Sequence, residues 1–365
     1  ETVITKNIGL DLGFLNNRLN VSFDAYIRDT KDMLMAGKTL PGVYGASSPR
    51  MNVADLRTKG WEASVTWGDS FTLASKPFNY RIMAGIGDNT SKVTKYDNPN
   101  RTLTDPYEGQ QLGEIWGYVV DGYFKTDEEA RNYKVDQSFV NQMINASALD
   151  NVLHAGDLKF VDLDGNNKIE QTTSANDRKD MKVIGNSLPR YNYNFGISAD
   201  WYGIDFSVLF QGIGKQNWYP GAETSMFWGP YSRPYASFIP SDFMSQVWSE
   251  ENTNAYFPRP RGYVALGSNR ELAVVNTKYL QNLAYCRLKN LSIGYTLPDK
   301  WLSKIGFEKI RVYFSGENLL TFTKLHSDYI DPEQASASNS WKTSKSDANI
   351  YPWAKTYSFG VDITF

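Results

Sequence analysis

Tyr357-Ser-Phe-Gly-Val-Asp-Ile-Thr-Phe365, the stretch that ends the chain, alternates strictly between apolar and polar side chains. A period of two predicts a β-strand with one apolar face and one hydrated face. This strand stops on an aromatic residue and has no polar tail. Strands of this kind occur both in soluble β-sandwiches and in the walls of membrane β-barrels, so the stretch alone leaves that choice open.

The composition favours one large all-β body over two ordinary domains. The 365 residues include 23 Tyr, 19 Phe, 10 Trp and 28 Gly, and aromatic residues are typical of strands. A formal net charge of -2 gives no electrostatic reason to expect nucleic acid, so we predict no such partner. The single cysteine, Cys286, excludes an intramolecular disulfide. No apolar run reaches the length of a transmembrane helix, but barrel strands need only about 9–11 alternating residues.

The same alternation recurs along the chain and predicts about nine strands. They cover residues 4–15, 19–27, 61–67, 78–86, 191–201, 204–210, 291–297, 310–314 and 357–365. Their apolar faces carry no charge. The charged side chains fall on the opposite faces: Asp11, Asp24, Glu62, Arg81, Asp200, Asp205, Arg311 and Asp362. An Arg or Lys that faces lipid at mid-bilayer costs about 2–4 kcal/mol, so a barrel must segregate its charges in this way.

The connections between these strands separate the two architectures. Short connections lie at residues 16–18, 68–77, 202–203 and 298–308, and long ones at 31–52, 88–189, 212–277 and 323–354. Because short and long alternate, tight turns gather on one rim and long loops on the other. A sandwich also segregates its charges, but it has no reason to show this asymmetry. Outer-membrane barrels have short periplasmic turns and long extracellular loops.

We therefore predict an all-β fold, the C-terminal part of a large antiparallel transmembrane β-barrel that crosses the lipid bilayer of the outer membrane many times. An odd number of strands leaves the wall open, and an unpaired strand in lipid leaves backbone groups without hydrogen bonds. We expect residues 4–15 to pair with a strand outside this chain. The N-terminus runs directly into that strand, which suggests a sequence cut from a longer one.

A series of segments, in a fixed order, carries a specific resemblance. They are Gly109-Gln-Gln-Leu-Gly-Glu-Ile-Trp-Gly-Tyr118, Gly156-Asp-Leu-Lys-Phe-Val-Asp-Leu-Asp-Gly-Asn-Asn167, Val183-Ile-Gly-Asn-Ser-Leu-Pro-Arg-Tyr191, Tyr285-Cys-Arg-Leu-Lys-Asn-Leu-Ser-Ile-Gly-Tyr-Thr-Leu-Pro298 and Arg311-Val-Tyr-Phe-Ser-Gly-Glu-Asn318. The series resembles SusC/RagA-type TonB-dependent outer-membrane transporters of the Bacteroidetes. The resemblance spans the whole chain, and the ordered set is more specific than any single motif.

This resemblance implies a segment of a barrel of about 22 strands. It implies that an N-terminal plug and the first strands, which are absent here, complete the same barrel. It further implies coupling to TonB through that N-terminal part, and a SusD-like lipoprotein as a lid over the extracellular mouth. The implied cargo is an oligosaccharide, with a peptide as the alternative. The loops at 88–189 and 212–277 would then be extracellular.

An EF-hand-like segment at 162–177 is a candidate calcium site within the first of these two loops. Asp162, Asp164 and Asn166 are spaced so that their oxygens converge, and Lys168 offers a backbone carbonyl. Position six is Asn167 in place of Gly, and Asn tolerates the left-handed conformation that the turn needs. Position twelve is Thr173, and the acid that matches the family pattern is Asp177. The alternative is a turn stabilised by its own side chains, without a metal.

Aromatic residues crowd the loop at 212–277 and provide candidate contacts with a substrate or a lid. The candidates are Trp218, Trp228, Tyr231 and Tyr235. Sugar rings stack on such faces; the alternative is that these residues pack the loop on itself or against a lipoprotein lid.

No enzyme motif is present in the sequence, so we predict that the chain is not an enzyme. Two alternatives to an importer remain: a soluble, secreted β-protein that binds or cleaves glycans, and a barrel for passive diffusion.

Overall fold

The computed structural model describes residues 1–37, 43, 45, 49–140, 153–233, 235, 238–267, 270–302, 306–335, 345–346 and 351–365. Much of the predicted loops at 31–52 and 323–354 lies outside these residues. Within the described part of the chain, no helix is both long enough and apolar enough to cross a membrane.

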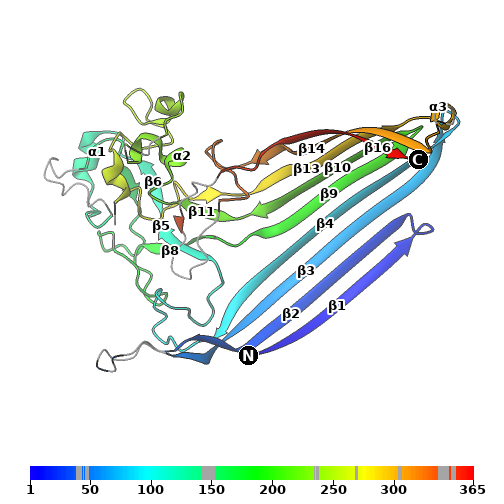
Figure 1. Cartoon of the computed structure of the whole chain (residues 1–365). Coiled ribbons are helices and arrows are strands. Elements are labelled where there is room, and N and C mark those ends of the chain that lie inside the picture. The colour runs from blue at the N-terminus through cyan, green and yellow to red at the C-terminus, as the bar shows by residue number, and fades with distance from the viewer. Residues whose placement is uncertain are drawn as a thin grey trace.

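One open antiparallel sheet of nine strands forms the body of the protein (Figure 1). Its strands follow one another in chain order, and each pairs with the next. They are β1 (Thr2–Phe14), β2 (Leu19–Ala36), β3 (Arg50–Leu73), β4 (Lys76–Lys95), β9 (Arg190–Trp201), β10 (Ile204–Lys215), β13 (Tyr285–Thr296), β14 (Lys309–Thr323) and β16 (Thr356–Thr364). The strand number and the antiparallel order predicted from the sequence are confirmed, and the sheet is a partial barrel wall with β1 and β16 as its edges.

The two ends of the sheet differ as the connection lengths predict. At one end, tight turns join the strands, and the short helix α3 (Asp299–Leu302) and the C-terminus lie beside them (Figure 1). Tyr202 and Gly203 form the two-residue turn predicted for them, with positive φ angles of 51° and 85°. The long connections and their short helices gather at the other end, where the N-terminus also lies (Figure 1).

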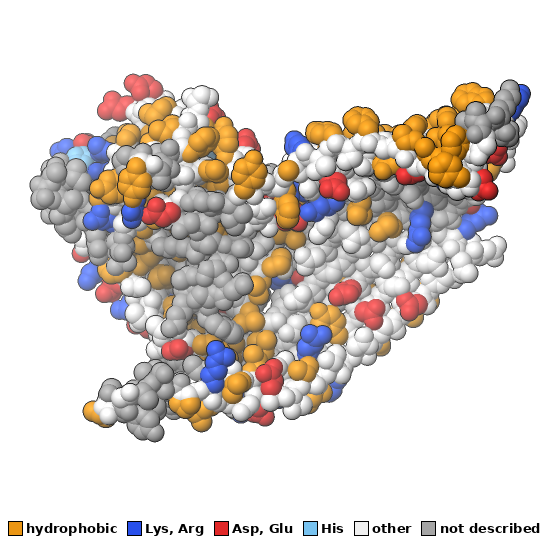
Figure 2. Space-filling view, viewed as in Figure 1, with side chains coloured by type: hydrophobic (Ala, Val, Ile, Leu, Met, Phe, Trp, Pro, Cys, Tyr) orange, Lys and Arg blue, Asp and Glu red, His pale blue; other side chains and the backbone are white. Residues whose placement is uncertain are grey.

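The strand faces are segregated as the alternation predicts. Directly opposed residues of antiparallel strands share a face, and Ile82 of β4 lies opposite Ile197 of β9 on the apolar face. Both side chains are exposed. On the other face, Arg311 of β14 forms ion pairs with Asp205 of β10 and Asp362 of β16, at 2.6 and 3.2 Å. Figure 2 shows charged side chains spread over the sheet, with hydrophobic side chains along the β14 and β16 edge.

The nine strands form one sheet, and no second sheet covers the apolar face in the described residues. Its apolar side chains are therefore exposed, which removes the shared interior that a sandwich requires.

Several strands are longer than the alternation indicates, and this corrects the predicted loop boundaries. β2 continues to Ala36 and β4 to Lys95, inside the predicted loops at 31–52 and 88–189, and β10 runs to Lys215. The predicted connection at 68–77 is also shorter, because only Ala74 and Ser75 form the turn. Strand pairing continues through segments such as 31–36 and 90–95, where apolar and polar residues do not alternate regularly, so the sequence gives no period-two signal there.

The long connections fold together into what we call the loop cap: the described residues of 96–189, 216–284 and 324–335. Its short strands are β5 (Glu114–Tyr118), β6 (Val120–Tyr123), β7 (Leu158–Phe160), β8 (Met181–Asn186), β11 (Asn217–Pro220) and β12 (Gln281–Asn282). Its helices are α1 (Asp127–Asn132), α2 (Ser225–Trp228) and three 3-10 turns, Gly229–Tyr231, Phe243–Gln246 and Tyr263–Leu266. The short strand β15 (Lys345–Ser346) pairs with β11. One buried hydrophobic cluster, with Phe160, Trp228 and Leu325 as members, joins all three segments. The cap therefore has its own core, separate from the sheet.

Candidate functional site

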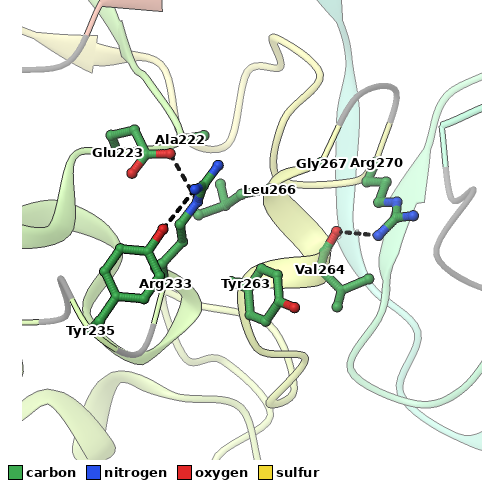
Figure 3. Close-up of a pocket in the computed structure, with 9 residues that line it drawn as sticks. All are labelled: Ala222, Glu223, Arg233, Tyr235, Tyr263, Val264, Leu266, Gly267 and Arg270. Atoms are coloured by element: carbon green, nitrogen blue, oxygen red, sulfur yellow. Dashed lines mark hydrogen bonds and ion pairs between the residues drawn. The ribbon is translucent and has the colours of Figure 1, made fainter.

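A pocket of about 550 Å³ opens within the loop cap and is the candidate ligand site (Figure 3). Two parts of the long connection between β10 and β13 form the pocket. One is the segment around α2, and the other is the 3-10 turn Tyr263–Leu266 with the residues after it. The lining residues are Ala222, Glu223, Arg233, Tyr235, Tyr263, Val264, Leu266, Gly267 and Arg270.

Two tyrosine rings and an ion pair give the pocket its chemistry. Tyr235 and Tyr263 are 79% and 53% exposed, which leaves ring surface available to a ligand. The Arg233 guanidinium lies 3.1 Å from a Glu223 carboxylate oxygen, and it donates a hydrogen bond of 2.6 Å to the Tyr235 hydroxyl (Figure 3). This hydrogen bond orients the Tyr235 ring. An exposed aromatic surface beside polar groups of fixed position can hold an amphipathic ring such as a sugar.

Arg270 places a second cation in the pocket wall. Its Nη1 donates to the Val264 carbonyl oxygen at 2.9 Å, which ties the arginine to the turn that carries Tyr263 (Figure 3). The site therefore has two arginines and one glutamate, and a ligand with a carboxylate or several hydroxyls would find donors there.

The structure separates the four aromatic candidates into two groups. Trp218, Trp228 and Tyr231 are buried in the cap core, where the Trp228 indole donates to the Gly221 carbonyl at 2.9 Å. These three pack the loop on itself, which was one of the two alternatives open from the sequence. Only Tyr235 lies exposed, at the pocket.

Sequence reasoning missed Glu223, Tyr263 and Arg270. They come together only through the packing of two irregular segments, and no spacing in the sequence signals this. The one available hint was Tyr263, an aromatic residue next to Gly262 in a loop, since loop positions often carry function.

The EF-hand-like segment folds into a tight turn with inward-facing oxygens. Asp162 accepts hydrogen bonds from the backbone N–H groups of Gly165 and Asn167, both at 2.7 Å. Asn166 accepts one from the Lys168 N–H at 2.8 Å. Asn167 has a φ of 63°, so the left-handed conformation predicted for it is confirmed.

The acid that joins this turn is Asp180, not the predicted Asp177. Carboxylate oxygens of Asp162, Asp164 and Asp180 all lie within 4.8 Å of one another. Asp180 is fully buried and accepts hydrogen bonds from the N–H groups of Leu163 and Glu170. Asp177 points elsewhere, 3.9 Å from the Lys179 ammonium, with 70% of its side chain exposed.

The donor set of this turn fits a hard cation. Burial raises the pKa of Asp180, and the negative charges of Asp164 and Asp162 raise it further. The nearby lysines, Lys168 and Lys179, form ion pairs with Glu170, and Lys179 also pairs with Asp177. A cation with oxygen ligands, such as calcium, would relieve the repulsion among the three converging carboxylates.

The fold defines the class of protein as a membrane β-barrel. This chain forms part of the barrel wall and a folded cap at one end of it. The chain belongs to the TonB dependent receptor-like β-barrel family, whose model matches residues 1–319. This membership confirms the resemblance noted from the sequence motifs, and the family is one of outer-membrane barrels.

The similar proteins agree with this assignment. TonB-dependent receptor P3 of Formosa agariphila is 28% identical, and the match covers 100% of this chain and 34% of that receptor. TonB-dependent receptor SusC of Bacteroides thetaiotaomicron is 23% identical, over 100% of this chain and 32% of SusC. The chain thus spans about a third of the length of these curated relatives.

Among solved structures, the RagAB peptide importer in its open-open state matches with a TM-score of 0.70 and 22% identity, over 99% of this chain and 34% of that one. A second structure, titled as the RagAB peptide transporter, matches with a TM-score of 0.68 and 20% identity, over 100% of this chain and 35% of the other. At these identities the likeness establishes the fold.

Proposed function

We propose that this chain is the C-terminal part of an outer-membrane, TonB-dependent transporter that imports oligosaccharides. The observation that supports this proposal most directly is that the sheet has one apolar face and one charged face. One face exposes uncharged side chains, and the other carries ion pairs such as Arg311–Asp205. A wall of this kind suits hydrocarbon on one side and an aqueous passage on the other. The alternative of a soluble, secreted glycan-binding protein would require that apolar face to be covered.

The proposal includes partners outside this chain. The N-terminal remainder of the barrel would pair with the β1 edge, and a plug in that remainder would couple transport to TonB. A SusD-like lipoprotein would cover the loop cap. Support comes from the relatives, since one is named SusC and the structural neighbours are importers called RagAB.

The pocket favours an oligosaccharide as cargo. Tyr235 and Tyr263 expose ring faces, and the Arg233–Glu223 pair lies next to them. A peptide is the second candidate, because the pocket holds both an acid and two arginines, and because the solved RagAB structures are described as a peptide transporter and a peptide importer. We place the cargo subsite at this pocket in either case.

The test is uptake by cells of the native host that carry either the intact gene for the full-length protein or its deletion. Both strains are offered labelled neutral oligosaccharides, labelled acidic oligosaccharides and labelled peptides. We expect the deletion to abolish uptake of an oligosaccharide, and an uncoupler to abolish uptake by the intact strain. Uptake that withstands the uncoupler would indicate passive diffusion, and selective loss of peptide uptake would establish the second candidate.

We further propose that calcium braces the loop cap at Asp162, Asp164, Asn166 and the Lys168 carbonyl, with Asp180 as the closing acid. The convergence of three carboxylates within 4.8 Å supports this. The ion would order the turn and take no part in transport chemistry.

A further inference from the structure

The outward face of the sheet changes from apolar to basic at the loop end of β1 to β4. On β3, the outward positions run through Val65, Ala63 and Trp61 and then reach Lys59 and Arg57. Side chains two residues apart on a strand share a face, so these five point the same way. The basic positions follow directly where the apolar positions end.

Strand register gathers four cations from three strands at this level. Lys6 of β1 lies opposite Ile27, and Ile27 lies opposite Lys59. Lys6 and Lys59 therefore flank one apolar side chain, and their strands are about 10 Å apart. Lys92 of β4 lies opposite Arg57 in the next row. We call Lys6, Arg57, Lys59 and Lys92 the basic patch; all four are exposed.

The carboxylates near the basic patch are already neutralised. Each has its own cationic partner: Asp29 with Arg57, Asp55 with Lys31, Asp32 with Lys95, and Asp88 with Arg190. Within the described residues, no carboxylate lies in ion-pair distance of Lys6, Lys59 or Lys92. Three lysines therefore carry uncompensated positive charge on a surface that continues into the apolar band.

We propose that the basic patch binds the phosphate group of an anionic lipid in the outer leaflet. This rests on the proposed function, which places the loop end of the sheet at the outer surface. Head groups lie at the edge of the hydrocarbon, where the patch begins, and lysine stems can lie along apolar surface while the ammonium reaches a phosphate. The acyl chains would lie on the apolar face, beside residues such as Ile8 and Phe23.

The test measures binding of monophosphoryl lipid A, a phosphorylated glycolipid, to the delipidated full-length transporter by native mass spectrometry. The variant carries Lys6→Gln, Lys59→Gln and Lys92→Gln. The matched control carries Lys125→Gln, Lys134→Gln and Lys300→Gln, which removes the same charge from exposed lysines elsewhere. A second variant, Lys59→Gln alone, keeps the test interpretable if the triple variant does not fold. The heat-dependent gel shift of folded barrels shows whether each variant is folded.

We expect roughly fivefold weaker lipid binding for Lys59→Gln and roughly a hundredfold for the triple variant, with wild-type binding by the control. Unchanged binding by the triple variant would overturn the proposal, as would an equal loss in the control. Binding of inorganic phosphate by the wild type without any binding of the lipid would overturn the proposal and assign the patch to free phosphate. Uptake assays on the same variants keep the two proposals apart, because lipid binding can fail while import persists.

Discussion

Arg287 of β13 and Asp331 of the last connection form a buried ion pair, with 2.7 Å between Nη2 and Oδ1. Their side chains are only 3% and 5% exposed. Arg287 also lies 2.6 Å from a Glu333 carboxylate oxygen, and the backbone N–H of Trp353 donates to Asp331. One arginine on the barrel wall thus anchors the connection that contributes Leu325 to the cap core.

Replacing Arg287 with Gln should release this connection. The change leaves the buried Asp331 carboxylate without its cation, and breaking a buried pair from one side costs about 3–5 kcal/mol. We expect faster hydrogen exchange in residues 325–335 of the full-length protein. Arg18→Gln is the control, because the Arg18–Asp69 pair is exposed at 53% on the arginine side and such pairs contribute at most about 1 kcal/mol. Equal effects of the two substitutions would show that Arg287 does not anchor the segment.

Glu271 should make the stability of the cap depend on pH. It is fully buried, its Oε1 has no hydrogen-bond partner among the described residues, and Oε2 accepts a long bond of 3.4 Å from the Leu158 N–H. Burial and then the charge of Asp157 raise the pKa of Glu271 from 4.5 to about 8. The folded state therefore favours the protonated form.

Because the folded pKa is raised, the contribution of Glu271 is full below pH 4.5 and is lost as the pH rises through about 8. The slope is at most about 1.4 kcal/mol per pH unit. We expect Glu271→Gln to match the wild type near pH 5 and to be more stable at pH 9. Hydrogen exchange around Leu158, corrected for the intrinsic effect of pH, measures this. A pH dependence that survives the substitution would assign it to another group.

Trp228 should contribute to the stability of the cap, whereas Tyr235 should contribute to cargo binding. Trp228→Ala removes a fully buried side chain and should destabilise the cap by about 3–5 kcal/mol. Tyr235→Ala removes an exposed ring and should leave cap stability unchanged while it weakens cargo binding. Hydrogen exchange across the cap and calorimetric titration of cargo distinguish the two effects. Normal cargo affinity in Tyr235→Ala would show that the cargo does not bind at this pocket.

Calcium should protect the turn at 162–180 from proteolysis. Asp164→Asn should abolish the protection that added calcium confers, because it removes one of three converging carboxylates. Asp177→Asn should keep it, since Asp177 lies outside that cluster. Protection that is lost only in the Asp177 variant would restore the ligand predicted from the sequence. Protection that is independent of calcium would favour a turn without a metal.

The sheet was predictable because apolar and polar side chains alternate along each strand with a period of two. Ile82 and Ile197 fall on the apolar face by alternation alone, and the Tyr202–Gly203 turn follows from its two-residue spacing. The strand ends were not predictable, because outside the apolar band the ladder continues through residues such as Lys59 and Lys92 without alternation.

The candidate site could be predicted only in part. The EF-hand-like turn is local in sequence, so its spacing identified Asp162 and Asp164 as members of the carboxylate cluster, but Asp180 joins it through tertiary packing. The same limit applies to the pocket. Tyr235 stood out as an aromatic loop residue, whereas its neighbour Tyr263 was missed because nothing in the sequence brings the two segments together.

We propose that the uncharged face of the sheet contacts hydrocarbon and that the charged face lines an aqueous passage. Single cysteines at Val65, Thr66, Ile197 and Ser198 test this by spin-label accessibility, in the full-length protein in bilayers, after Cys286→Ala and the replacement of any cysteine outside this chain. We predict that labels at Val65 and Ile197 collide with oxygen dissolved in lipid, and that labels at Thr66 and Ser198 collide with a water-soluble relaxing agent. Equal accessibility at neighbouring positions, or the reverse order, would contradict the claim.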